Sequence, residues 1–215
     1  MKAKFRVPLY ISLFAIVFLN GFETGGYQAC LFNISREFGL NDADMGTLAS
    51  VQLIAVLIAP IIFGYMADRK GKKRVLLLFL ATLIMGCLWV FFSKSAFYFC
   101  PGIFLIGFSI SSLQYVSIAA LADAYPATGK KKMGVLTAMY ALGAFVSPLV
   151  CKLASDNGIS WRSLFILITI LSLIIITSVI GSDFSQQEIS SKIENDMRTH
   201  WVLSGVILLC VIMFV

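Results

Sequence analysis

The stretch Gly64-Tyr-Met-Ala-Asp-Arg-Lys-Gly-Lys-Lys-Arg74 lies between two long apolar runs and gathers charge in one short segment. It places one aspartate, Asp68, and several basic residues around two glycines. Glycines favour turns, and a short basic loop between apolar runs is typical of the surface of a membrane. The segment therefore predicts a tight loop that joins two membrane helices.

The composition also indicates a membrane protein. The chain has 215 residues, of which 59% are hydrophobic and 13% charged, whereas a soluble domain is about 45–50% apolar and about 25% charged. So few charges cannot cover a water-facing surface, and we expect an all-α integral membrane protein in contact with the lipid bilayer. The net charge of +6 does not indicate nucleic-acid binding, because the basic residues lie in short loops between apolar runs.

Apolar runs long enough to cross a bilayer, about 20 residues, define the predicted domains. A six-helix bundle fills 1–181, a polar cytoplasmic linker fills 182–199, and 200–215 begins a seventh helix within which we expect the sequence to end. The five cysteines show no metal-ligand spacing and are expected to be small buried apolar residues. The six complete spans are predicted at 8–33, 44–67, 74–93, 96–123, 131–154 and 161–181.

The lysines and arginines predict the orientation. Of the 17 in the chain, all but Arg36, Lys94, Lys152 and Arg162 lie on the side of the N-terminus. Since cytoplasmic loops are enriched in Lys and Arg, we predict a cell-membrane protein with its N-terminus and the Gly64–Arg74 stretch in the cytoplasm.

Local signals predict some helix ends and contacts. Asn41, with Asp44 three residues later, is predicted to cap the second helix, and Ser160 the sixth. Gly21 and Gly25 are four residues apart, a spacing that allows another helix to approach closely.

Glu23 is the only ionisable residue in the middle of a predicted span. Asn20, Tyr27 and Gln28 fall on the same broad helical face. Because burial disfavours the charged form of a carboxyl group, Glu23 is suited to carry a proton. The alternative is a protonated Glu23 that hydrogen-bonds to a neighbouring helix and serves only packing.

Other polar residues predict which helices line a cavity. Gln52, Gln114 and Tyr140 lie within the second, fourth and fifth spans, while the third and sixth spans contain no mid-span amide or carboxylate. We therefore expect the first, second, fourth and fifth helices to face a substrate cavity and the other two to be peripheral. Interhelical hydrogen bonding is the alternative role for Gln52 and Gln114.

Several motifs together resemble the major facilitator superfamily. The Gly64–Arg74 stretch is similar to the family's loop motif between helices two and three: Gly, three residues, Asp, a basic residue, any residue, Gly, then basic residues. The resemblance extends to the ends of other helices and covers the N-terminal half of such a transporter plus the start of helix seven. The further matches are Asp123-Ala-Tyr-Pro126 with Lys130–Lys132, Gly134 and Gly143 with Pro148, and Trp161-Arg162 with Phe165.

The sequence departs from the pattern of drug and proton antiporters in this family. Residues 96–114 contain no Arg or Lys, Ser147 replaces the glycine expected before Pro148, and Cys151-Lys152 replaces a closing glycine pair. These departures weaken an assignment as a drug/proton antiporter. The stretch Gly21-Phe-Glu-Thr-Gly-Gly-Tyr-Gln28 resembles sugar and fucose-type permeases, and with Glu23 as proton carrier the resemblance implies proton-coupled symport of a sugar-like or other polar metabolite. Two alternatives stay open: a drug or metabolite proton antiporter, and a non-transporting membrane sensor, assembly subunit or inactive truncated product.

The resemblance also implies a mechanism in which two six-helix halves, each an inverted pair of three-helix repeats, rock around a central site. Asp68 would engage a helix terminus in the missing C-terminal half, and Arg69 and Arg74 would balance the carboxylates. Lys72 and Lys73 are expected only to fix orientation. The implied cytoplasmic gate consists of Gly64, Asp68, Arg69, Gly71, Arg74 and Asp123.

No enzyme or cofactor is expected. The sequence has no paired catalytic carboxylates, no nucleophile–base arrangement, and no Gly-Lys-Ser/Thr ending to a phosphate loop. The predicted partners are lipid, a small-molecule substrate and the C-terminal six-helix half, with a proton gradient as the driving force.

Overall fold

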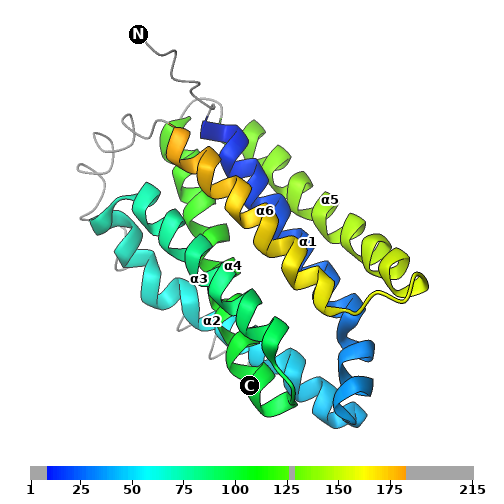
Figure 1. Cartoon of the computed structure of the whole chain (residues 1–215). Coiled ribbons are helices and arrows are strands. Elements are labelled where there is room, and N and C mark those ends of the chain that lie inside the picture. Colours follow the sequence, from blue (N-terminus) through cyan, green and yellow to red (C-terminus); the bar gives the residue numbers. More distant parts are fainter. Residues whose placement is uncertain (1–8, 126–128, 183–215) are drawn as a thin grey trace, which may run out of the picture.

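The computed structural model describes residues 9–125 and 129–182, without the side chains of 63–70 and 129–131. Six helices fill these ranges, and each contains a segment long and apolar enough to cross a membrane, which confirms the predicted spans. The predicted seventh run and all but the first residue of the predicted linker lie outside the described residues. The helices are α1 Leu9–Phe38, α2 Asp42–Lys70, α3 Lys72–Phe92, α4 Ala96–Ala124, α5 Gly129–Asp156 and α6 Arg162–Gly181 (Figure 1).

Asn41 caps α2 as predicted. Its side chain accepts a hydrogen bond from the Asp44 backbone N–H at 2.9 Å, and the Asp44 carboxylate accepts one from the Asn41 N–H at 3.2 Å. This reciprocal pair satisfies two backbone donors at the start of the helix. The corresponding prediction for Ser160 was wrong, because α6 begins at Arg162 with Trp161 as its N-cap and no side-chain capping bond. The Ser160 hydroxyl only accepts a long hydrogen bond of 3.4 Å from the Arg162 N–H.

Gly71 alone separates α2 from α3. Its φ of 85° lies in the region that disfavours residues with a side chain. The predicted tight turn at Gly71 is therefore confirmed. We call the end of the bundle at this turn the Gly71 end, and the opposite end, where Gly39 joins α1 to α2, the Gly39 end.

The helix pairs repeat in an inverted pattern. α1 packs on α5, α2 on α4, α3 on α4 and α6, and α1 on α6. Exchanging α1, α2 and α3 with α4, α5 and α6 leaves this set of pairs unchanged. Since α1 begins at the Gly71 end and α4 at the Gly39 end, the two sets of three helices run in opposite directions, as the predicted 3+3 repeat requires.

Small residues bring α1 and α5 together. A Cβ atom at Gly21 would overlap the Tyr140 carbonyl, and one at Gly25 would lie 2.9 Å from Ala144 Cα. From the other side, a Cβ at Gly143 would lie 2.7 Å from the Phe22 backbone nitrogen. These approaches confirm the packing role predicted for Gly21 and Gly25.

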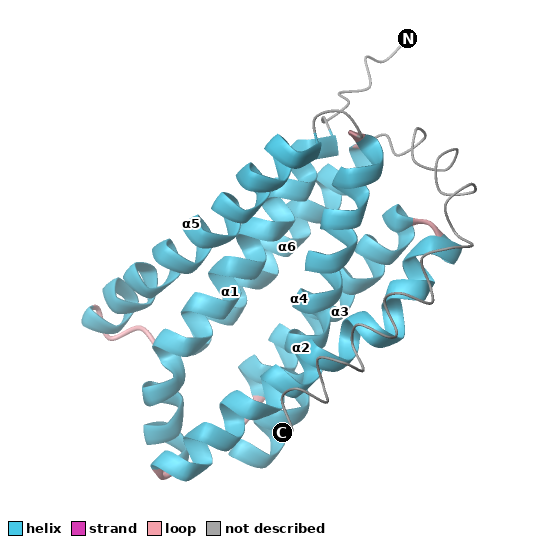
Figure 2. Ribbon diagram, turned by 180° about the vertical axis from the view of Figure 1, so that it is seen from behind, coloured by secondary structure: helices cyan, strands magenta, loops and turns pink. Residues whose placement is uncertain are grey.

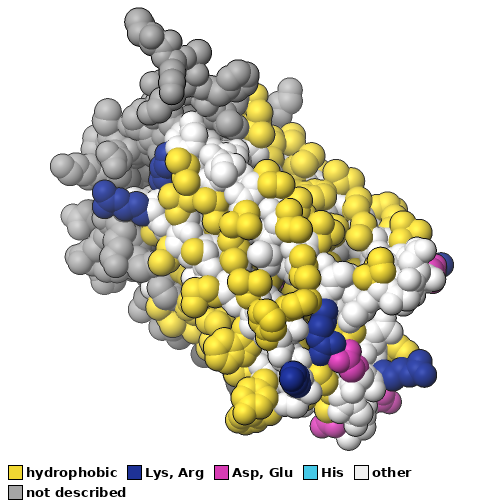
Figure 3. All heavy atoms as spheres, viewed as in Figure 1, with side chains coloured by type: hydrophobic (Ala, Val, Ile, Leu, Met, Phe, Trp, Pro, Cys, Tyr) yellow, Lys and Arg dark blue, Asp and Glu magenta, His cyan; other side chains and the backbone are white. Residues whose placement is uncertain are grey.

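The described surface is apolar around its middle. Figure 3 shows hydrophobic side chains across the visible face, with Lys and Arg toward the two ends and Asp and Glu at the Gly39 end. α2 and α5 are the least buried of the six spans. They lie at opposite edges of the bundle, with α1 and α4 between them (Figure 2).

Candidate functional site

Four of the predicted site residues meet in the middle of the bundle. α1 contributes Asn20 and Glu23, α2 contributes Gln52, and α4 contributes Gln114. We call these four residues the polar cluster. Two hydrogen bonds between helices join them, Glu23 to Gln52 and Asn20 to Gln114.

Glu23 is bound on one side only. Gln52 Nε2 donates to Glu23 Oε1 at 2.8 Å, and both side chains are buried, with exposed fractions of 0% and 3%. Glu23 Oε2 has no hydrogen-bond partner among the residues that the structure describes. An ionised carboxylate with a single donor is costly in apolar surroundings, so one oxygen remains free to hold a proton or meet a polar solute.

Gly107 on α4 leaves room for Gln52. A Cβ atom at Gly107 would lie 2.7 Å from the Gln52 carbonyl oxygen and 2.9 Å from Gln52 Cγ. Nearby, Ser111 Oγ on α4 donates to the Val56 carbonyl oxygen of α2 at 2.7 Å. Gly107 was not among the predicted site residues, although a glycine inside a helix is unfavourable by about 1 kcal/mol and often marks close packing.

Asn20 connects α1 to α4. Its Nδ2 donates to the Ile110 carbonyl at 3.0 Å and to Gln114 Oε1 at 3.3 Å. Asn20 Oδ1 is buried with no partner within the described part of the chain. Asn20 is buried whereas Gln114 is half-buried, so the Gln114 amide lies at the edge of the cluster.

The other predicted cavity residues do not join the cluster through described hydrogen bonds. Tyr27 is fully buried and stacks on Phe99 with ring centroids 6.4 Å apart, and its hydroxyl has no partner among the described residues. Tyr140 is half-buried and meets α1 through its backbone at Gly21. Gln28 is exposed, because it lies a further 100° around α1 from Tyr27.

The Gly71 end contains two lysines that reach other helices. Lys72 Nζ forms an ion pair with Asp123 and donates to the Ala119 carbonyl at 3.4 Å. Lys73 Nζ donates to the carbonyls of Ile180 and Ser182 at 2.8 and 2.9 Å. The prediction that these lysines only fix orientation was therefore incomplete, since both bind the ends of helices α4 and α6.

The remaining gate residues are less fully described. Among the described side chains, Asp123 pairs with Lys72, a partner that was not predicted, and Arg74 is exposed. The positions of Gly64, Asp68 and Arg69 fall in α2, but their side chains lie outside the described residues. The expected contact of Asp68 with a second half stays a prediction.

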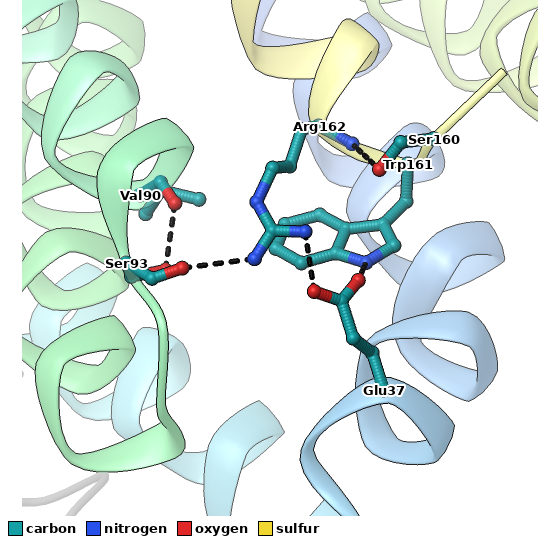
Figure 4. A network of polar contacts seen from close by, with 6 residues as sticks. All are labelled: Glu37, Val90, Ser93, Ser160, Trp161 and Arg162. Atoms are coloured by element: carbon teal, nitrogen blue, oxygen red, sulfur yellow. Dashed lines mark hydrogen bonds and ion pairs between the residues drawn. The ribbon is translucent and has the colours of Figure 1, made fainter.

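At the Gly39 end, Arg162 joins three helices. One guanidinium nitrogen donates to Glu37 at 2.5 Å and another to the Ser93 carbonyl at 2.9 Å, while Trp161 Nε1 donates to the same Glu37 carboxylate at 2.6 Å (Figure 4). We call Glu37, Ser93, Trp161 and Arg162 the Arg162 group. From the sequence, Trp161 and Arg162 stood out only as a family match. Their contacts with Glu37 and Ser93 were not predicted, although opposite charges at the ends of neighbouring spans were a signal.

The polar cluster can bind a proton or a polar solute. It offers a carboxylate, three amides and two buried oxygens, Glu23 Oε2 and Asn20 Oδ1, that have no partner among the described residues. Within the described ranges, no three His, Cys, Asp or Glu side chains group to hold a metal ion. The described side chains of the cluster thus present hydrogen-bonding amides and one carboxyl group.

Known transporters resemble this chain in sequence. It is 27% identical over 167 residues to the mouse solute carrier family 2, facilitated glucose transporter member 10, covering 74% of this chain and 31% of that protein. The Escherichia coli inner membrane transport protein YdiN is 23% identical, over 90% of this chain and 47% of its own length. The multidrug transporter MdfA of Edwardsiella ictaluri is 25% identical, over 68% and 36%.

The fold also matches a solved transporter. A crystal structure of the peptide transporter POT superimposes with a TM-score of 0.74 at 18% identity, covering 95% of this chain and 45% of that one. The chain thus spans half or less of the length of each of these proteins, and at this identity the likeness to POT shows the fold alone. The family model of the Major Facilitator Superfamily matches residues 13–215, and the chain therefore belongs to that superfamily.

Proposed function

We propose that the protein is part of a secondary active transporter that moves a small polar solute, such as a sugar, together with protons by alternating access. The observation that carries this proposal is the buried Glu23 carboxylate, bound by Gln52 across two helices in a chain of this superfamily. A carboxyl group that is buried in one conformation and reaches water in another can load and release a proton.

The geometry supports coupling through helix movement. Glu23 lies on α1 and its donor on α2, while Asn20 joins α1 to α4. A movement that separates α1 from α2 breaks the Gln52 hydrogen bond to the carboxyl group and changes its affinity for a proton. Protonation and opening of the cluster are then linked in both directions.

The sugar assignment comes from relatives such as facilitated glucose transporter member 10. Similarity to the multidrug transporter MdfA supports the alternative, a proton antiporter that exports drugs or metabolites. The absence of Arg and Lys from residues 96–114 favours symport over that alternative. A non-transporting sensor or assembly subunit is the candidate from another class, and it predicts no solute flux at all.

In this proposal the Gly71 end is cytoplasmic and forms a gate with a second six-helix half. The exposed apolar side chains of α2 and α5, among them Leu57 and Phe145, suit contact with that half or with lipid. Asp68 engages a helix N-terminus of the second half, an interaction that contributes about 0.3–1 kcal/mol.

Uptake of labelled glucose into vesicles that contain the full-length protein tests the proton assignment. With acid outside, we expect wild-type protein to concentrate glucose, and Glu23→Gln to keep downhill exchange but to lose gradient-driven accumulation at least tenfold. Asp156→Asn, which changes an exposed carboxylate at the end of α5, serves as the control. Accumulation by Glu23→Gln would contradict the assignment, whereas gradient-driven ethidium efflux without glucose uptake would select the antiporter.

The gate is tested separately with Asp68→Asn. We expect this variant to bind glucose but to exchange it several-fold more slowly, because one closed state loses a contact between the halves. Asp42→Asn, at the other end of α2, provides the matched control. An Asp68→Asn variant with a wild-type exchange rate would exclude the gate role.

A further inference from the structure

Two cysteines that are far apart in sequence face each other across α1 and α5. Gly26 on α1 lies against Ser147 on α5, because a Cβ at Gly26 would overlap Ser147 Oγ. One helical turn farther along both helices, Cys30 and Cys151 line the same small pocket between α1 and α5. The close approach of the two helices at the glycines thus continues into a thiol pair.

Oxygen atoms surround the same pair. Cys151 Sγ lies 3.8 Å from the Gly26 carbonyl oxygen. Ser147 Oγ lies beside Cys151; it is fully buried and has no regular hydrogen-bond partner among the described residues. Two oxygen atoms, the Gly26 carbonyl and the Ser147 hydroxyl, thus lie beside the Cys151 thiol.

A pocket gives access to the thiols. It is lined by both Cys30 and Cys151 and extends toward the Gly39 end, where Asn33, Ser155 and Ser163 supply polar side chains. No residue of the polar cluster lines this pocket, so the thiol pair is separate from the site at Glu23.

We propose that Cys30 and Cys151 form a binding site for a soft metal ion of low coordination number, such as Hg²⁺, Ag⁺ or Cu⁺. Both thiols lose their protons to water, and two metal–sulfur bonds form, with Ser147 Oγ and the Gly26 carbonyl as weaker oxygen neighbours. Thiolates select soft ions. Zinc is a poorer fit, because structural zinc sites use four ligands and no third His, Cys, Asp or Glu groups with this pair among the described residues.

The site has consequences that are independent of transport. A bridging metal joins α1 to α5 where the two helices already pack tightly, so it stabilises the folded bundle by mass action. Cys100 on α4 is half-buried, does not line this pocket, and serves as an internal control.

Mercuric chloride at one equivalent, added to the full-length protein in detergent, tests the proposal. We expect the melting temperature to rise by several degrees and an ultraviolet mercury–thiolate band to appear. Both effects should vanish in Cys30→Ser and in Cys151→Ser and persist in Cys100→Ser. Persistence in either of the first two variants, or loss in Cys100→Ser, would overturn the site.

X-ray absorption at the mercury edge on the wild-type protein gives a result that does not depend on how the variants fold. Two sulfur neighbours at bonding distance are expected, and both should be lost from the spectrum when Cys30 and Cys151 are alkylated beforehand. A single sulfur neighbour, or two sulfurs that survive alkylation of this pair, would refute the dithiolate.

Discussion

At each end of the bundle, the start of one helix binds the ends of two other helices, but the two ends use different side chains. At the Gly71 end, Lys72 and Lys73 at the start of α3 bind the ends of α4 and α6. At the Gly39 end, Arg162 at the start of α6 binds the ends of α1 and α3. The inverted repeat exchanges α3 with α6 and α4 with α1, so these two sets of contacts occupy equivalent places.

The difference lies in how many partners one cation serves. The guanidinium of Arg162 is a planar fork that donates to a carboxylate and a carbonyl at once, whereas an ammonium behaves as a compact point charge. At the Gly71 end, two lysines therefore make the contacts to two helix ends that Arg162 makes alone at the Gly39 end. The pairs also differ in burial, because the Lys72 and Asp123 side chains are 7% and 22% exposed against 21% and 42% for Arg162 and Glu37.

The largest effect is expected from Lys72→Met. Removing the ammonium leaves the Asp123 carboxylate half-buried without its described partner, and breaking a largely buried pair on one side should lower the free energy of unfolding by about 2–3 kcal/mol, between surface and fully buried pairs. Reversible unfolding by dodecyl sulfate in mixed micelles measures this change.

The matched control is Lys152→Met, which removes an exposed lysine on α5 and should change stability by less than about 0.5 kcal/mol. Adding Asp123→Asn to Lys72→Met should recover part of the loss, because the unpaired charge disappears. No recovery would show that packing of the lysine stem, rather than the ion pair, stabilises this end.

Part of the fold and part of the candidate site could be predicted from the sequence. Apolar length and the Asn41 capping box located the helices correctly, since both depend on neighbouring residues. The rarity of polar residues inside spans also singled out Glu23, Gln52, Asn20 and Gln114. Their pairing was not predictable, because it depends on the register between helices.

Contacts between helix ends were not predicted either, because they also depend on the register between helices. Lys72 and Asp123 are distant in sequence, and only the packing of α3 on α4 brings them together. Gln28 was placed with Asn20 on one broad helical face, but at about 100° per residue it lies about 80° from Asn20 and about 140° from Glu23, at the edge of that face, and it is exposed in the structure. Sequence periodicity gives a broad face of a helix and cannot locate the edge of the contact.

A smaller effect is expected from Arg162→Lys. The charge stays, but one ammonium cannot reproduce the fork to Glu37 and the Ser93 carbonyl, so the free energy of unfolding should fall by about 1 kcal/mol. Arg36→Lys, an exposed change on α1, is the control under the same micelle titration. A variant as stable as the wild type would mean that a single ammonium suffices at the Gly39 end and that the guanidinium fork is not required.

The smallest effect is expected from Lys73→Met, about 0.5 kcal/mol. Its two acceptors are carbonyls at the end of α6, and water can replace the ammonium there, so only a modest hydrogen-bond and dipole contribution is lost. Hydrogen exchange of α6 peptides measures the local opening. If Lys73→Met destabilises the protein as much as Lys72→Met, the carbonyl contacts dominate over the Asp123 pair. The two lysines would then share the stabilisation of the Gly71 end in a different proportion from the two hydrogen-bonding branches of the Arg162 guanidinium at the Gly39 end.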